Sequence, residues 1–172
     1  SHSTYRPVAV YASDVNGDGI TELPRAVLMA GYKDTSSSDA VYMLDWYAYG
    51  IGKVPTKVAT TYQNISDAWS LLIDQKWHDR ITAIKANDGG LSYVEFFEYR
   101  KNKMSIPLFN IYCATGSNRE YYAERTDLIQ LGQTTQAIYF AKLTNEGEQS
   151  ELALTGDEIK ARFSLVNQAW NN

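Results

Sequence analysis

The sequence predicts an α+β protein that consists mostly of antiparallel β-structure. Short apolar runs recur about every 8 to 12 residues and are separated by turn-forming residues, a spacing typical of antiparallel sheets. Tyrosine is abundant, at 13 of 172 residues, and chains rich in aromatic residues favour strands. Near the C-terminus the apolar residues recur with a helical period, so one amphipathic helix is expected there.

The first half of the chain, residues 1–75, is expected to form one antiparallel β unit. Its strand candidates are apolar, β-prone runs bounded by Gly, Pro, Asn, Asp or Ser. These candidates cover residues 5–12, 24–32, 41–49, 57–62 and 68–73. Strands of this length and spacing are typical of a propeller blade or a β-sandwich.

Residues 76–172 are expected to form a second, α+β unit. Its strand candidates cover residues 81–86, 91–100, 104–114, 127–130 and 136–143. Asp88-Gly89-Gly90 favours a hairpin turn between the first two of them. Pro107 lies inside the third candidate, which predicts an edge position or a bulge there. Ser117 and Glu120 match a capping box and predict a short helix over residues 118–124.

The clearest helix is predicted over residues 156–170. Thr155 and Glu158 form a capping box at its start. Its apolar residues recur at helical spacing and are Ile159, Phe163, Val166 and Trp170. This stripe is expected to pack on the preceding sheet, and the alternative is that it docks on a partner or on a membrane surface.

One stretch, residues 14–22, has a residue order that indicates a metal site. Asp14, Asn16 and Asp18 place side-chain oxygens at every second position, and Glu22 and the backbone carbonyl of Ile20 add two more. Calcium takes six to eight oxygen ligands in a flexible cage, and water completes the shell. An Asx-rich turn that binds nothing is the alternative. An EF-hand does not fit, because Arg25 stands at position 12, where that loop needs a bidentate Glu.

The run Asp14-Val15-Asn16-Gly17-Asp18-Gly19-Ile20-Thr21-Glu22-Leu23 resembles the calcium loop of FG-GAP and VCBS-type repeats. Such repeats build β-propellers in integrin α subunits and in many bacterial surface proteins. The resemblance implies a structural Ca2+ ion that ties two strands of a blade together. Its implied ligands are Asp14, Asn16, Asp18, the Ile20 carbonyl and Glu22, the last of which is more often Asp in the family. A propeller takes at least about four blades, so the single repeat in this chain cannot close one alone.

Scattered positions of the second half resemble a C-terminal module that follows FG-GAP-like repeats in secreted lipoproteins of Gram-positive gut bacteria. They are Lys76-Trp77, Ile81-Thr82, Ile111-Tyr112, Ile138-Tyr139-Phe140-Ala141, Leu154-Thr155, Glu158-Ile159 and Arg162-Phe163. The resemblance implies an extracellular place on the bacterial cell surface, with lipid anchoring through a part not present in this chain. A calcium loop of millimolar affinity also makes most sense outside the cytoplasm.

Composition excludes several classes of function. The net charge of −4 and the absence of a Lys/Arg cluster argue against nucleic-acid binding. No apolar run approaches the roughly 18 to 20 residues that a membrane-spanning helix needs. Cys113 is the only cysteine, which excludes an internal disulfide and a cysteine zinc cluster, and its apolar surroundings predict a core position.

A catalytic site is not expected. Among the histidines, His78 stands alone between Trp77 and Asp79 and is predicted to be a solvated loop residue. Glu95 and Glu98 are an odd number of residues apart in a strand, so they are expected on opposite faces unless a bulge intervenes. Asp45 is predicted to be a single polar residue on a β surface.

Trp46, Tyr47, Trp69 and Trp77 are the candidates for a ligand-binding platform, because aromatic rings stack on sugars. Core packing is the competing interpretation, since alternation in the strand 41–49 places Trp46 and Tyr47 on opposite faces. Taken together, the sequence predicts a non-catalytic, calcium-stabilised extracellular module that binds an unknown protein or glycan. The alternatives are a fragment of a secreted hydrolase and a purely structural spacer.

Overall fold

The computed structural model describes residues 10–36 and 39–166, and it confirms a mostly antiparallel β fold with short helices. The first sheet has the order β1 (Leu23–Leu28), β2 (Tyr42–Ala48), β3 (Thr56–Asn64), β4 (Trp69–Leu72) and β10 (Phe163–Leu165). The second has the order β5 (Ile81–Asp88), β6 (Leu91–Arg100), β7 (Lys103–Thr115), β9 (Ala137–Leu143) and β8 (Ile129–Gln133). The helices are η1 (Gln75–Trp77), α1 (Glu120–Ala123), η2 (Gly147–Gln149) and α2 (Gly156–Arg162).

The first four strands follow one another as an antiparallel meander, as the spacing of the apolar runs predicts. Strand β1 is bordered by β2 on one side, with Leu23 opposite Tyr47. Most of the strand expected over residues 5–12 lies outside the described residues, and residues 10–12 are not in a strand. Ser13 forms an isolated antiparallel bridge with Glu22, immediately before β1 begins.

The second sheet contains the irregularity that Pro107 predicts. Phe96 of β6 lies opposite Phe109 of β7, whereas Phe97 lies opposite Pro107, so Leu108 is the extra residue of a bulge. Pairing with β9 begins at Phe109, which leaves Pro107 in a part of β7 that has no second neighbour in the sheet. A proline that cannot donate a backbone hydrogen bond is therefore accommodated without loss to the ladder.

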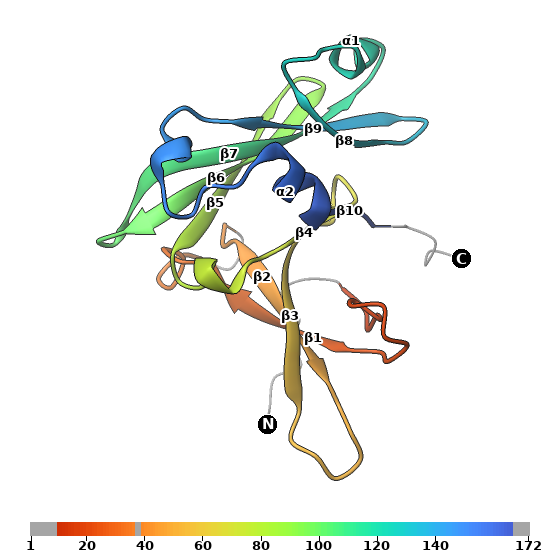
Figure 1. Cartoon of the computed structure of the whole chain (residues 1–172), viewed down its shortest axis with the longest axis vertical. Coiled ribbons are helices and arrows are strands. Elements are labelled where there is room, and N and C mark those ends of the chain that lie inside the picture. Colours follow the sequence, from red (N-terminus) through yellow and green to blue (C-terminus); the bar gives the residue numbers. More distant parts are fainter. Residues whose placement is uncertain (1–9, 37–38, 167–172) are drawn as a thin grey trace.

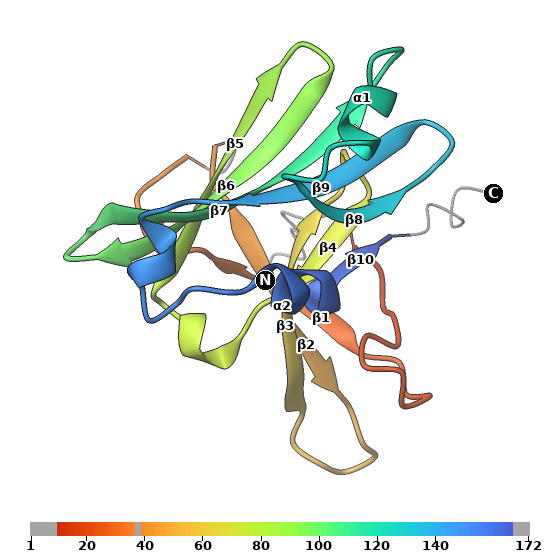
Figure 2. The same ribbon diagram turned by 45° about the horizontal axis from the view of Figure 1, so that its top comes forward.

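The two sheets lie against each other and share a hydrophobic core (Figure 1, Figure 2). The chain passes from the first to the second between Leu72 and Ile81, near the expected boundary at residue 75. Tyr62 of the first sheet meets Phe96 of the second edge-on, with ring centroids 5.5 Å apart. The segments 1–75 and 76–172 thus contribute to one core, to which Cys113 also belongs, as predicted.

The C-terminal helix is shorter than predicted. The capping box is present, because Thr155 accepts a hydrogen bond from the Glu158 N–H and Glu158 accepts one from the Thr155 N–H. The helix ends at Arg162, however, and Phe163–Leu165 form β10, antiparallel to β4. Phe163 stacks on Trp69 with the ring planes at 29°. Its apolar side chain, which contributed to the helical pattern, is therefore buried while its backbone belongs to strand β10. Trp170 lies outside the described residues.

Two further expectations about helices have different outcomes. Helix α2 packs beside β8 and β9, as expected for a helix that covers the second sheet. The capping box expected from Ser117 does not form, because the residue that precedes α1 is Arg119 and its side chain makes no capping hydrogen bond. None of the described helices has the length and apolar character needed to cross a membrane.

Candidate metal centre

The loop of residues 14–21 is closed at its base by the Ser13–Glu22 bridge. The two residues exchange backbone hydrogen bonds of 3.1 and 2.9 Å. Glu22 then leads directly into β1, whose first residue, Leu23, pairs with Tyr47 of β2. The loop is therefore fixed to one end of the first sheet.

Asp14 organises the interior of this loop. Its Oδ1 accepts hydrogen bonds from the backbone N–H groups of Gly17 (2.7 Å) and Asp18 (3.1 Å), and its Oδ2 accepts one from Gly19 (2.8 Å). Gly17 and Gly19 have φ angles of +76° and +83°, which residues with a Cβ rarely adopt. The glycines thus permit a turn that wraps the backbone around one carboxylate.

The other polar side chains of the loop also turn inward. Asp18 accepts a hydrogen bond from the Ile20 N–H at 2.8 Å, and Asn16 accepts one from the Asp18 N–H at 3.1 Å. The Asn16 amide also donates to Asp18 at 3.0 Å. These contacts bring Asn16 and Asp18 together within the bend, and the ligand roles of Asn16, Asp18 and the Ile20 carbonyl stay predictions.

Glu22 differs from the other acidic residues of the loop because its side chain is fully buried, with 0% exposure. Its Oε2 accepts a hydrogen bond from the Val15 N–H at 2.9 Å. Its Oε1 is also buried, and no donor among the described residues reaches it. A buried carboxylate oxygen without a donor is costly, because water no longer solvates its charge.

Three carboxylates converge at this point. One oxygen from each of Asp14, Asp18 and Glu22 lies within 4.8 Å of the others. In the described part of the chain, this is the one group of three acidic, His or Cys residues close enough to hold a metal ion. A cation among them would relieve their mutual repulsion and would supply the partner that Glu22 lacks.

The predicted aromatic platform is wrong for its tryptophans. Trp46, Trp69 and Trp77 are fully buried. The Trp46 indole donates to the Thr61 hydroxyl at 2.8 Å, and the Trp77 indole donates to the Leu152 carbonyl at 3.1 Å. Residues on both faces of β2 are buried, so its aromatic side chains are used for packing. Tyr47 is half-buried.

The acidic residues weighed as catalytic candidates have structural partners. Glu98 is buried on the same face of β6 as Phe96, whereas Glu95 lies on the opposite face. Glu98 accepts a hydrogen bond from Ser150 at 2.6 Å and forms an ion pair with Arg100.

The remaining two candidates are also explained. Asp45 is buried, and it accepts a hydrogen bond from the Thr60 hydroxyl at 2.6 Å. The single polar residue predicted on this strand is therefore buried and hydrogen-bonded within the sheet. His78 is exposed as predicted, with Nδ1 3.2 Å from an Asp79 carboxylate oxygen.

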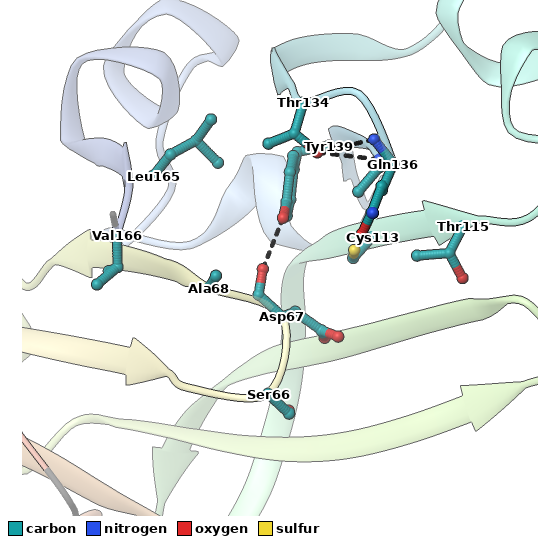
Figure 3. A pocket seen from close by; sticks show the side chains of 11 residues that line it. Ser66, Asp67, Ala68, Cys113, Thr115, Thr134, Gln136, Tyr139, Leu165 and Val166 are labelled. Carbon is teal, nitrogen blue, oxygen red and sulfur yellow. Dashed lines mark hydrogen bonds between the residues drawn. The ribbon is translucent and has the colours of Figure 1, made fainter. Parts of the chain in front are cut away.

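Sequence reasoning missed a pocket of about 370 Å³ that lies where the two sheets meet (Figure 3). Several of its polar groups have hydrogen-bond partners within the chain. The Tyr139 hydroxyl donates to the Asp67 carbonyl at 2.7 Å, and the Asp67 carboxylate accepts from Ser92 at 2.7 Å. Burial raises the pKa of the Cys113 thiol to about 11, so the thiol stays protonated at neutral pH. The residues that line this pocket come from separate parts of the chain, so no local sequence pattern could have predicted it.

No protein-family model, curated protein or solved structure matches the chain. The resemblance to FG-GAP and VCBS-type calcium loops therefore rests on residues 14–23 alone. The geometry of the Asp14, Asp18 and Glu22 carboxylates is independent of that resemblance, because it follows from distances and burial.

Proposed function

We propose that residues 14–22 hold one structural Ca2+ ion and that the chain is a non-catalytic, calcium-stabilised module of the FG-GAP/VCBS type. The observation that carries this proposal is the buried, unpartnered Oε1 of Glu22 beside the carboxylates of Asp14 and Asp18. A cation explains why a charged group is buried there, since buried charges are normally paired or bound to metal.

Calcium fits this donor set better than other common ions. The ligands proposed are all oxygens: three carboxylates, the Asn16 amide and the Ile20 carbonyl, with water to complete the shell. Calcium accepts such irregular oxygen cages, whereas magnesium demands near-ideal octahedral geometry and retains its waters. Zinc sites in proteins usually include His or Cys, and neither occurs in the loop.

The proposed role of the ion is to fasten the start of the first sheet. The ligands Asp14 and Glu22 flank the two ends of the bend that the Ser13–Glu22 bridge closes. The first ladder position of β1 follows at Leu23, opposite Tyr47. An ion that holds both ends of the bend would thereby hold β1 in register with β2.

A binding role at the bacterial cell surface is the most economical account of the rest of the chain. The two family resemblances and the high calcium concentration outside cells support an extracellular location. The dispersal of Glu95, Glu98, Asp45 and His78 gives a hydrolase no convergent pair of acid and base groups. The partner would be a protein or a glycan, and a screen of both, with calcium and with chelator, separates a binding module from a structural spacer.

The calcium site is tested by thermal unfolding and by calorimetric titration with Ca2+. A ligand at about one hundred times its dissociation constant stabilises the folded state by about 2.7 kcal/mol. The wild-type protein should therefore melt several degrees higher in calcium than in chelator. Glu22→Gln and Asp18→Ala should lose this difference, whereas Glu95→Gln on the second sheet should keep it. Identical melting of the wild type in calcium and in chelator would refute the site.

A further inference from the structure

The hairpin between β2 and β3 extends away from both sheets (Figure 1, Figure 2). Its ladder ends at the Ala48–Thr56 pair, so residues 49–55 form the tip. The tip turns through Gly50 and Gly52, where the Lys53 N–H donates to the Gly50 carbonyl at 3.1 Å and Gly52 has a φ of +70°. The tip is therefore an ordered, protruding turn.

This tip carries apolar side chains that are exposed in the described part of the chain, residues 10–36 and 39–166. Ile51 is 104% exposed, Val54 85% and Tyr49 56%. Isolated exposed apolar residues are ordinary on protein surfaces, but a cluster at a protruding tip marks an interaction site. Ile51 and Val54 are almost fully exposed, so they contribute little packing to the hairpin.

The tip itself, residues 49–55, carries one charged residue, Lys53. Residues 46–66 contain no Asp or Glu, and the charged residues in that segment are Lys53 and Lys57, although the whole chain has a net charge of −4. Lys57 lies 3.6 Å from Asp45 at the base of the hairpin. Lys53 lies within the tip, between Ile51 and Val54. The binding partner of this tip should therefore have an apolar region that accepts Ile51 and Val54, bordered by negatively charged groups that attract Lys53.

We propose that the β2–β3 tip inserts into the interface of an anionic lipid bilayer. Ile51 and Val54 would enter the boundary between head groups and acyl chains, a depth at which peripheral proteins bury apolar side chains. Tyr49 would lie at the level of the head groups, where tyrosine is enriched, and Lys53 would approach the lipid phosphates.

A membrane fits this convex tip better than a folded protein partner does. A stable protein interface buries about 1,600 Å² and needs some 20 residues on each side. Three apolar side chains on a narrow turn cannot supply that area, whereas a bilayer deforms around a small insertion. The proposal uses no residue of the 14–22 loop, which lies at the same end of the first sheet, where Leu23 pairs with Tyr47.

Vesicle co-sedimentation tests this assignment. The probes are vesicles of phosphatidylglycerol mixed with phosphatidylcholine and vesicles of phosphatidylcholine alone, in chelator so that no divalent ion bridges protein and lipid. The wild type should partition onto the anionic vesicles, and Ile51→Ser or Val54→Ser should weaken that partition about tenfold or more. Lys53→Gln should weaken it about fivefold, because one lysine loses its attraction to the anionic surface.

Two variants provide matched controls. Ile65→Ser changes an exposed isoleucine in the turn at the other end of β3, and Lys85→Gln changes an exposed lysine on β5. Both control variants should bind the vesicles as strongly as the wild type does. All tip and control variants should have the melting temperature of the wild type in chelator. The proposal is overturned if wild-type protein stays in the supernatant, if Ile51→Ser binds equally well, or if Ile51 instead mediates a dimer in gel filtration.

Discussion

The Tyr139 hydroxyl donates a 2.7 Å hydrogen bond to the backbone carbonyl of Asp67, joining β9 of the second sheet to the β3–β4 turn of the first (Figure 3). The Asp67 carboxylate accepts a second hydrogen bond, from Ser92 of β6. One turn of the first sheet is thus bound to two strands of the second. The shared core therefore has polar contacts at its margin that fix how the two sheets meet.

Tyr139→Phe removes the first of these contacts and leaves the ring in the core. The free energy of unfolding should fall by about 1 kcal/mol, the usual net worth of one buried hydrogen bond. Chemical denaturation measures the change. Tyr121→Phe is the control, because Tyr121 is an exposed tyrosine of α1 and its change should leave stability within about 0.5 kcal/mol of the wild type.

Glu98→Gln keeps the shape of a buried side chain and removes its charge. Ser150 can still donate to the amide oxygen, but the ion pairs with Arg80 and Arg100 are lost. Both arginines are partly exposed and can return to water, so the expected loss is about 1 to 2 kcal/mol, below the cost of stranding a fully buried charge. Urea unfolding of this variant beside Glu95→Gln, which should be near neutral, tests the expectation. Equal stability of the two would mean that Glu98 contributes nothing through its charge.

Asp74 makes stability depend on pH in the acid range. A hydrogen bond from the Lys76 N–H and the nearby Arg162 guanidinium lower the pKa of its carboxyl. A lowered pKa in the folded state stabilises the protein at pH values above the ordinary carboxyl pKa of about 4, and this contribution disappears as the pH falls through the lowered pKa. Asp74→Asn should therefore lower stability at neutral pH and show a shallower loss below pH 4 or so.

A series of urea unfolding curves from neutral to acid pH measures this effect. Asp79→Asn is the matched control, since Asp79 is exposed on the same connection between the sheets. Its stability should follow the wild-type curve. If the stability of Asp74→Asn also followed the wild-type curve, the contacts of Asp74 with Lys76 and Arg162 would contribute nothing to the free energy of unfolding.

Several elements were predictable because their signals are local. The strand expected over residues 91–100 matches β6, since alternating apolar residues and a Gly-Gly turn specify both its faces and its start. The Thr155 capping box depends on residues three apart and formed as expected. Pro107 lies next to the Leu108 bulge and in a part of β7 with one neighbouring strand, as expected for a residue that lacks an N–H.

Other features depended on contacts between distant parts of the chain. Phe163 and Val166 continue the helical spacing of apolar residues that starts at Ile159. Residues 163–165 nevertheless pair with β4 as a strand, and Phe163 stacks on Trp69. Alternation suggested that the aromatic residues of β2 pack on both faces, but only the structure shows that Trp69 and Trp77 are buried as well.

The sequence by itself determined the antiparallel strands, most of their boundaries, and the set of oxygen donors between Asp14 and Glu22, because each depends on residues close together in the chain. The tertiary structure decided that a strand from the C-terminal region completes the first sheet and that Glu22 is buried with one oxygen unpartnered. Burial and strand pairing depend on which distant segments of the chain pack together, and a local sequence pattern does not specify those long-range contacts.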